Sequence, residues 1–231
     1  MNLKLLLKVF PVVLLMVVGM GGVVRSEATA QQPANQSQAI NQLIQQLKSG
    51  NSQTRWFAVY ALGQMGESTK FAIPSLILLL NDSNEYVRSS SAHVLGKMGE
   101  SAQSAIPHLI PLLKDSDPGV RSSAANALGK MGKSGIPSLI PLLKDADVDV
   151  RWSATTALVG MGESAKSAIP SLIPLLKDSN VWVRSLVANA LGEMGESAKS
   201  AIPSLIPLLK DSDPMVRSSA TEALKKLGYK P

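Results

Sequence analysis

Cysteine is absent from the 231 residues of this chain, and histidine occurs only twice. Without cysteine the chain forms no disulfide and carries no lipid on a thiol, so its chemistry does not depend on the redox state of its compartment. Neither His93 nor His108 has a second ligand at metal spacing, and a metal site needs several such side chains together. The sequence therefore predicts no metal centre and no bound cofactor.

Catalytic motifs and strand patterns are scarce as well. Serine is frequent, but it never stands in a Gly-x-Ser-x-Gly elbow, and there is no glycine-rich phosphate loop. Aromatic residues make up only 4% of the chain, and no segment alternates Val, Thr and Tyr in the manner of a strand. We expect no catalytic residues and no enzyme, and we expect an all-α fold.

The one long uncharged segment lies at the N-terminus. Residues 9–24 carry no charge, Lys4 and Lys8 precede them, and the small residues Ala28 and Ala30 follow at the spacing of a cleavage site. This order is typical of a secretory signal peptide, whereas a membrane span needs about 20 apolar residues. We expect residues 1–30 to be cleaved after Ala30 and the protein to be exported to the periplasm or outside the cell. An uncleaved segment would anchor it to the membrane.

The net charge is modest. Of the 23 basic and 17 acidic residues, three basic and one acidic lie in residues 1–30, which leaves 20 and 16 and a net charge of +4. Nucleic-acid binding requires Lys and Arg massed on one face, and these are spread evenly. We therefore expect no nucleic-acid partner, and no membrane contact once the signal is removed.

A tandem repeat fills the rest of the chain after a polar linker at residues 31–38. The repeat has a period of 33 residues with one step of 30, and such periods are typical of solenoids. It divides residues 39–231 into six units: 39–71, 72–104, 105–134, 135–167, 168–200 and 201–231.

Each unit contains two helical segments, here called helix A and helix B. In unit 3, residues 106–115 have an apolar face at helical spacing, and Pro111 should start or bend helix A, because proline lacks an N–H. Helix B follows, with Asp117 as N-cap, Pro118 in the first turn, and Gly132 closing it in the left-handed conformation. The sequence therefore predicts an α-solenoid of six helical hairpins.

The string LLKDSDPxVRxxAxxALGxMG resembles the HEAT repeat, in the form common in phycobilisome-lyase-type HEAT proteins of cyanobacteria. The resemblance covers about residues 39–231. It implies an α-solenoid with the B helices on the concave side and a role in binding other proteins. HEAT-type deoxyhypusine hydroxylases hold two irons through His-Glu pairs, which this chain lacks. Bilin lyases are closer in repeat type, but they act in the cytoplasm, whereas a signal peptide directs a protein out of it.

Acidic and basic residues recur at fixed positions in the units. An aspartate ends helix A, and an arginine follows six residues later near the start of helix B. Five copies of one pair are unsuited to catalysis, which needs one perturbed site, so we interpret them as a ladder of charge-assisted hydrogen bonds. Unit 1 has Ser49 in place of the aspartate, which predicts that each aspartate reaches back to the preceding unit. The ladder residues are Asp82, Arg88, Asp115, Arg121, Asp145, Arg151, Asp178, Arg184, Asp211 and Arg217.

The units differ most on one side of helix B, opposite its apolar stripe. All three tryptophans and two of the three tyrosines lie there. Large aromatic side chains on an exposed face often mark an interaction site, although those of unit 1 could instead pack as an end cap and the others against neighbouring helices. The candidate partner-binding residues are Trp56, Tyr60, Tyr86, His93, Asp149, Trp152, Trp182, Asn189 and Met215.

The short step lies between Met131 and Ile136, where three residues are missing. Three residues are about one helical turn, so we expect the stack to shift there and divide the variable face into two surfaces.

The simplest function that accounts for these features is that of an exported scaffold that binds another protein through its B helices. A bilin-lyase-like or chromophore-associated subunit and a purely mechanical spacer are the alternatives.

Overall fold

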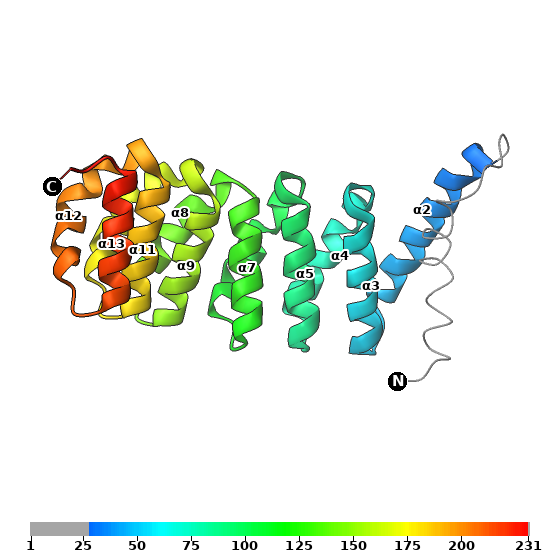
Figure 1. Ribbon diagram of the computed structural model, residues 1–231. Coiled ribbons are helices and arrows are strands. Elements are labelled where there is room, and N and C mark those ends of the chain that lie inside the picture. The colour runs from blue at the N-terminus through cyan, green and yellow to red at the C-terminus, as the bar shows by residue number, and fades with distance from the viewer. Residues whose placement is uncertain (1–27, 231) are drawn as a thin grey trace.

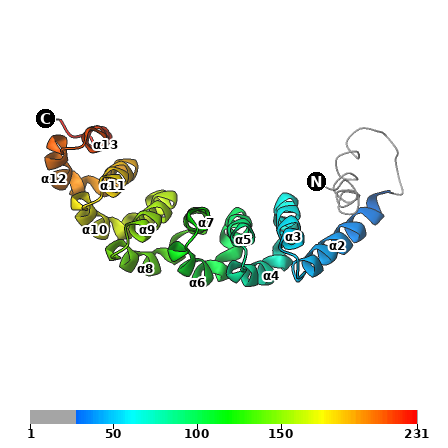
Figure 2. The same ribbon diagram turned by 90° about the horizontal axis from the view of Figure 1, so that it is seen from below.

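The computed structural model describes residues 28–230, which form one curved row of helical hairpins with no strand in that range. Figure 2 shows the row as an arc, with one layer of helices along its outer side and a second layer along its inner side. The expected signal segment falls almost entirely on residues 1–27, which lie outside the described residues. The all-α solenoid predicted from the repeat is confirmed.

The two layers correspond to helices A and B. Helices A lie on the convex side and are α2 (Ala28–Gln46), α4 (Ile73–Leu78), α6 (Ile106–Leu109), α8 (Ile136–Leu139), α10 (Ile169–Leu172) and α12 (Ile202–Leu205). Helices B line the concave side and are α3 (Ser52–Met65), α5 (Glu85–Lys97), α7 (Pro118–Lys130), α9 (Val148–Gly160), α11 (Val181–Glu193) and α13 (Pro214–Lys226). The concave side is therefore made of B helices, as the HEAT resemblance implies.

The polar segment 31–38, assigned above to a linker, lies within helix α2. Polarity does not prevent helix formation, because Ala and Gln are both good helix formers. The row therefore begins with a helix of 19 residues.

Helix A changes its hydrogen-bonding pattern at its second proline, as expected. In unit 3 the α-helix ends at Leu109, and a 3₁₀ turn runs over Pro111–Lys114. Proline cannot donate the i→i−4 bond, so the chain tightens into i→i−3 bonds. Unit 2 has Leu78 at this position, and there the α-helix continues through Leu78.

Each helix B starts at a polar cap and ends near a glycine. Asp117 Oδ1 accepts a hydrogen bond from the backbone N–H of Val120, and Pro118 is the first helical residue. The predicted conformation of Gly132 is only partly right. Its φ of 78° is positive, but its ψ of −168° is extended and not left-handed helical. That region of backbone space is open essentially to glycine alone, so the residue type is still explained.

The core runs without a break along the row, between the two layers. The leucine seven residues after each ladder arginine is fully or almost fully buried: Leu62, Leu95, Leu128, Leu158, Leu191 and Leu224. Small residues beside it let neighbouring B helices approach closely. A Cβ added to Gly96 would lie 2.7 Å from Cα of Ala127 on the next helix B.

Candidate functional site

The predicted ladder is present at four of the five steps between units. At each of these steps the arginine donates from Nε and Nη2 to the two carboxylate oxygens of the next unit's aspartate, over 2.6–2.9 Å. Such a bidentate pair is both strong and directional. The pairs are Arg55–Asp82, Arg88–Asp115, Arg151–Asp178 and Arg184–Asp211.

The ladder also binds the turn between helices A and B. In all six units Nη1 of the arginine donates to the carbonyl oxygen of the residue that follows helix A, at 2.7–2.9 Å. In unit 1 that oxygen belongs to Ser49. The aspartates reach back to the preceding unit, so the first unit needs none, and the predicted direction is confirmed.

The carboxylates of these four pairs are largely buried. The exposed fractions of the aspartate side chains are 6–13%. Burial alone would raise the pKa of Asp82, Asp115 and Asp178, but hydrogen bonds from the arginine and from a backbone N–H outweigh it, and each pKa is lowered. The hydrogen bond from Arg184 is the main cause of the lowered pKa of Asp211. The four carboxylates are ionised at neutral pH, and each joins its unit to the preceding one through the arginine.

The fifth step breaks the ladder, and here the prediction is wrong. Arg121 does not reach Asp145; its Nη2 donates instead to Asp149, at 2.7 Å. Asp145 accepts a hydrogen bond from Nζ of Lys114, at 2.6 Å. The carboxylate of Asp149 is 56% exposed, so the replacement pair is much more accessible to water than the regular ones.

The missing three residues explain this exchange. At a regular step Gly96, eight residues after its arginine, faces Ala127, six residues after the next arginine. At the short step Gly129 faces Gly160, which is nine residues after Arg151. Helix α9 is therefore displaced along α7 by three residues, or about 4.5 Å at 1.5 Å per residue. The predicted shift in the stack is confirmed, and the ladder prediction failed because it ignored this shift.

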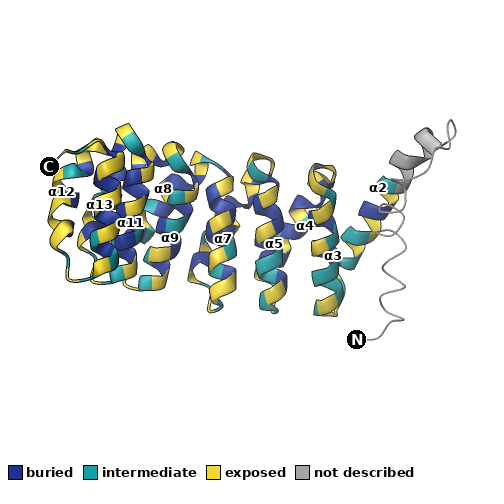
Figure 3. Ribbon diagram, viewed as in Figure 1, coloured by how far each residue is buried: buried dark blue, intermediate teal, exposed yellow. Residues whose placement is uncertain are grey.

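Most of the candidate partner-binding residues are exposed on the concave face. The exposed fractions of four large aromatic side chains are 54% for Tyr60, 66% for Tyr86, 39% for Trp152 and 58% for Trp182. His93, Asp149 and Asn189 are also exposed. Figure 3, which views the B helices from this side, shows exposed residues along all of them.

Two candidates are less accessible. Trp56 is half-buried against the core, stacked on Tyr60 with ring centroids 5.9 Å apart and edge-on to Phe57 at 4.9 Å. The ring contacts of Trp56 are with its own helix α3, and Tyr60 remains exposed. Met215, in the last unit, is half-buried too.

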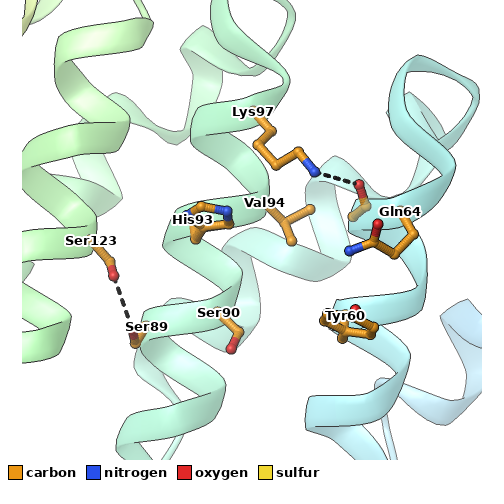
Figure 4. Close-up of a pocket in the computed structure, with 9 residues that line it drawn as sticks. Tyr60, Gln64, Ser89, Ser90, His93, Val94, Lys97 and Ser123 are labelled. Atoms are coloured by element: carbon orange, nitrogen blue, oxygen red, sulfur yellow. Dashed lines mark hydrogen bonds between the residues drawn. The ribbon is translucent and has the colours of Figure 1, made fainter.

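A groove of about 300 Å³ separates α3 from α5 (Figure 4). Tyr60 and Gln64 line it from α3, and His93 and Lys97 from α5. Lys97 donates from Nζ to the carbonyl oxygen of Gly63 across the groove, at 3.1 Å. Burial, together with the positive charges of Lys130 and Lys97, lowers the pKa of His93, so its ring is neutral at pH 7. No acidic side chain lines this groove.

Two further grooves on the same face are lined by three more aromatic residues, Trp56, Tyr86 and Trp152. One, between the N-terminal ends of α3 and α5, contains Trp56 and Tyr86. The other has a volume of about 250 Å³ and lies at the short step, where Trp152 stands beside the Arg121–Asp149 pair. The displacement of α9 thus places an aromatic ring and an ion pair together in one groove.

Two exposed apolar residues outside the B helices were missed. Phe71, the last residue of unit 1, is 85% exposed, and Leu78, in unit 2, is 74% exposed. Serine stands at the position of Phe71 in the other units that keep this turn, and proline stands at the position of Leu78 in units 3 to 6. Comparing copies of helix A and of the turn before it, and not only of helix B, would have found them.

The described residues hold no cluster of three or more His, Cys, Asp or Glu that could bind a metal ion. None of the helices between residues 28 and 230 is both long and apolar enough to span a membrane. The geometry of the concave face, with shallow grooves and exposed rings on rigid helices, suits contact with another macromolecular surface.

The sequence model of HEAT repeats matches this chain over residues 40–129, 73–158 and 136–225. The chain belongs to the HEAT-repeat family. A search of curated proteins gives no match.

Solved structures of other repeat proteins share the fold. The complex of CpcE and CpcF of phycocyanin lyase from Nostoc is 27% identical, with a TM-score of 0.54 over 82% of this chain and 77% of the matched one. An archaeal HEAT-like repeat protein from Thermococcus onnurineus is 16% identical, with a TM-score of 0.59 over 83% and 88%. A computationally designed armadillo repeat protein for modular peptide recognition is 21% identical, with a TM-score of 0.52 over 81% and 99%.

Proposed function

We propose that this HEAT-repeat protein is a scaffold that binds a partner protein through the concave face of its B helices. The observation that carries the proposal is that the residues that differ among the six units are also the exposed ones on this face. The ladder and core positions repeat almost unchanged, whereas Tyr86 and Trp182 each occur in one unit only and Trp152 has a counterpart only in Trp56; these three residues are 39–66% exposed. Residues that are needed only for stacking would repeat with the stack.

Aromatic side chains suit this role because they combine a large apolar area with little conformational freedom. Burial of apolar area stabilises a complex by roughly 25 cal/mol per Å², and tryptophan and tyrosine are enriched among the residues that dominate binding energy. Here they stand on helices that the ladder holds in fixed positions, so the loss of conformational entropy on binding is small. The three grooves between B helices would receive side chains of the partner.

We propose binding without catalysis. The aspartates with lowered pKa values are paired with arginine or lysine, and His93 has no nucleophile or carboxylate within hydrogen-bonding distance among the described residues. We also propose that the protein is exported, because the N-terminal pattern of two lysines, an uncharged segment and Ala28-x-Ala30 is that of a signal peptide.

The test is a pair of matched variants. We expect the double substitution Trp152→Ala and Trp182→Ala to keep the helical circular-dichroism signal and the thermal midpoint, because both rings lie outside the core. Used as bait with a cell-envelope extract, the variant should lose the protein that the unmodified chain captures. Phe71→Ala removes a more exposed ring away from the B helices and should leave capture unchanged. Equal capture by the double variant and the unmodified chain would refute the proposal.

The likeness to the phycocyanin lyase complex favours one second candidate, a lyase-like or chromophore-associated subunit. Two results would support it in place of the scaffold: recovery of the mature protein from the cytoplasm, and uptake of a visible bilin by the purified protein. A colourless protein in the envelope fraction would exclude it.

A further inference from the structure

The groove between α3 and α5 lies beside two lysines that occupy the same position in adjacent units. This position is nine residues after the ladder arginine, at the C-terminal end of helix B, and both lysines are exposed. From unit 1 to unit 6 it is occupied by Gln64, Lys97, Lys130, Gly160, Glu193 and Lys226. Like charges in neighbouring units repel each other, so stacking alone does not explain lysine in both unit 2 and unit 3.

The lysine of unit 6 shows how the chain can neutralise a charge at this position. Nζ of Lys226 donates to Oε1 of Glu193, one unit earlier, at 2.6 Å. The residue one unit before Lys97 is Gln64, and the residue one unit before Lys130 is Lys97. Among the described residues, neither Lys97 nor Lys130 forms an ion pair with a carboxylate.

The acidic side chains of units 2 and 3 lie away from this groove. Glu85 is in the first turn of α5, at the opposite end of the helix from Lys97, and Asp117 caps the N-terminus of α7. Glu100 follows α5 in the next turn and forms no ion pair with Lys97 or Lys130. The positive charge at this end of the concave face is therefore not compensated by the residues that line the groove.

The side chains beside the lysines add hydrogen-bond donors. His93 stands one turn before Lys97 on α5, and Ser90 and Tyr60 contribute hydroxyl groups to the same groove (Figure 4). Burial is the main cause of the lowered pKa of His93, and the positive charges of Lys130 and Lys97 add to it, so both lysines lie near its ring. Positive charge and donors together, without a carboxylate, suit an anionic ligand.

We propose that this groove binds an acidic segment of the partner protein, with one carboxylate against Lys97 and a second against Lys130. The inference rests on the function proposed above and adds the chemistry of the partner. Packed helices lie about 8–10 Å apart, so the two carboxylates would be separated by a similar distance. The exposed ring of Tyr60 would cover aliphatic groups of the same segment.

The test uses dye-labelled hexaglutamate as the probe and fluorescence anisotropy at low ionic strength. We expect the unmodified chain to bind it, and added salt to weaken binding because exposed charges are screened. Lys97→Gln combined with Lys130→Gln should weaken binding about fivefold. Lys144→Gln combined with Lys177→Gln removes the same charge from two exposed lysines at the ends of helices A, and should change binding by less than about twofold.

A substitution at Gln64 tests the site while keeping all of its lysines. Gln64→Glu places a carboxylate one unit before Lys97, as Glu193 stands one unit before Lys226. It should therefore weaken hexaglutamate binding without lowering the thermal midpoint. Gln64→Lys adds a positive charge and should strengthen binding. These two variants keep the proposal testable even if loss of the bond from Lys97 to the carbonyl oxygen of Gly63 destabilises the fold.

Three results would overturn the proposal. Hexaglutamate might fail to bind the unmodified chain, or the two lysine pairs might weaken binding equally, which would attribute it to net charge. Hexathymidylate that binds as tightly and responds to the same variants would assign the groove to phosphate groups. Trp152→Ala with Trp182→Ala should leave hexaglutamate binding unchanged, because neither ring lines this groove. Capture by that variant and hexaglutamate binding by the lysine variants thus test the two proposals separately.

Discussion

The regular steps of the solenoid and the short step between units 3 and 4 use the same sequence differently. At a regular step Arg151 holds both oxygens of Asp178, and the two side chains are 13% and 8% exposed. At the short step Arg121 makes one bond to Asp149, and Asp145 turns to Lys114, whose side chain is 54% exposed. The amino acids at the ladder positions are the same, so the difference comes from where the helices lie.

The comparison shows that the length of the turn before helix A decides which carboxylate pairs with the arginine of the preceding unit. Removing three residues before α8 leaves the ends of the B helices in contact at Gly129 and Gly160, but it moves α9 by about one turn along α7. The aspartate then no longer faces the arginine. The first turn of α9 lies opposite Arg121 instead, so Asp149 pairs with Arg121 and Trp152 lies beside the pair. A small deletion in a turn thus exchanges a structural pair for an exposed groove.

Acid should break all the regular pairs together and gives the largest expected effect. The folded-state pKa values of Asp82, Asp115, Asp178 and Asp211 are lowered, so their contribution to stability is complete above the unfolded value of about 3.9 and is lost as pH falls below it. Urea unfolding between pH 7 and pH 3 measures the loss. Asp178→Asn should reduce this pH dependence, and Glu163→Gln, which alters an exposed carboxylate, should not.

Removing one carboxylate separates the two kinds of step. Asp178→Ala leaves Arg151 without its partner, and we expect the free energy of unfolding to fall by about 1–3 kcal/mol, less than for a fully buried pair because water reaches the edge of this one. Asp145→Ala removes the pair with the exposed Lys114 and a hydrogen bond from the backbone N–H of Asp147. Because Asp178 accepts the equivalent bond from Asn180, the two substitutions differ in the ion pair, and the effect of Asp145→Ala should be smaller. Urea denaturation at pH 7 measures both. Equal losses would contradict the distinction.

A methyl group at the helix contacts gives a smaller effect. A Cβ on Gly96 would lie 2.7 Å from Cα of Ala127, so Gly96→Ala must push two B helices apart and should cost about 1–2 kcal/mol. At the short step a Cβ on Gly160 would lie 3.2 Å from Cα of Gly129, and we expect a lower cost. Gly50→Ala, with nothing within 4 Å, is the neutral control for the same thermal and urea measurements.

Much of this architecture could be predicted from the sequence because it repeats. The period, the caps such as Asp117, and the direction of the Asp-to-Arg pairs could be predicted because the same residue types recur at the same positions in successive units. The pairing of Arg121 could not be predicted by matching copies, since it depends on how far α9 slides when the turn shortens. The half-buried state of Trp56 depends on Phe57 and Tyr60 around it, which periodicity does not reveal.

The coupling between Arg121 and Asp145 tests the central claim most directly. A double-mutant cycle with Arg121→Gln and Asp145→Asn should give no coupling in the unmodified chain. In a chain whose turn GKSG is replaced by GESAKSA, which restores the missing residues, the same cycle should give a coupling equal to that of Arg151 and Asp178. Coupling in the unmodified chain, or none in the restored one, would contradict the claim that turn length decides the pairing.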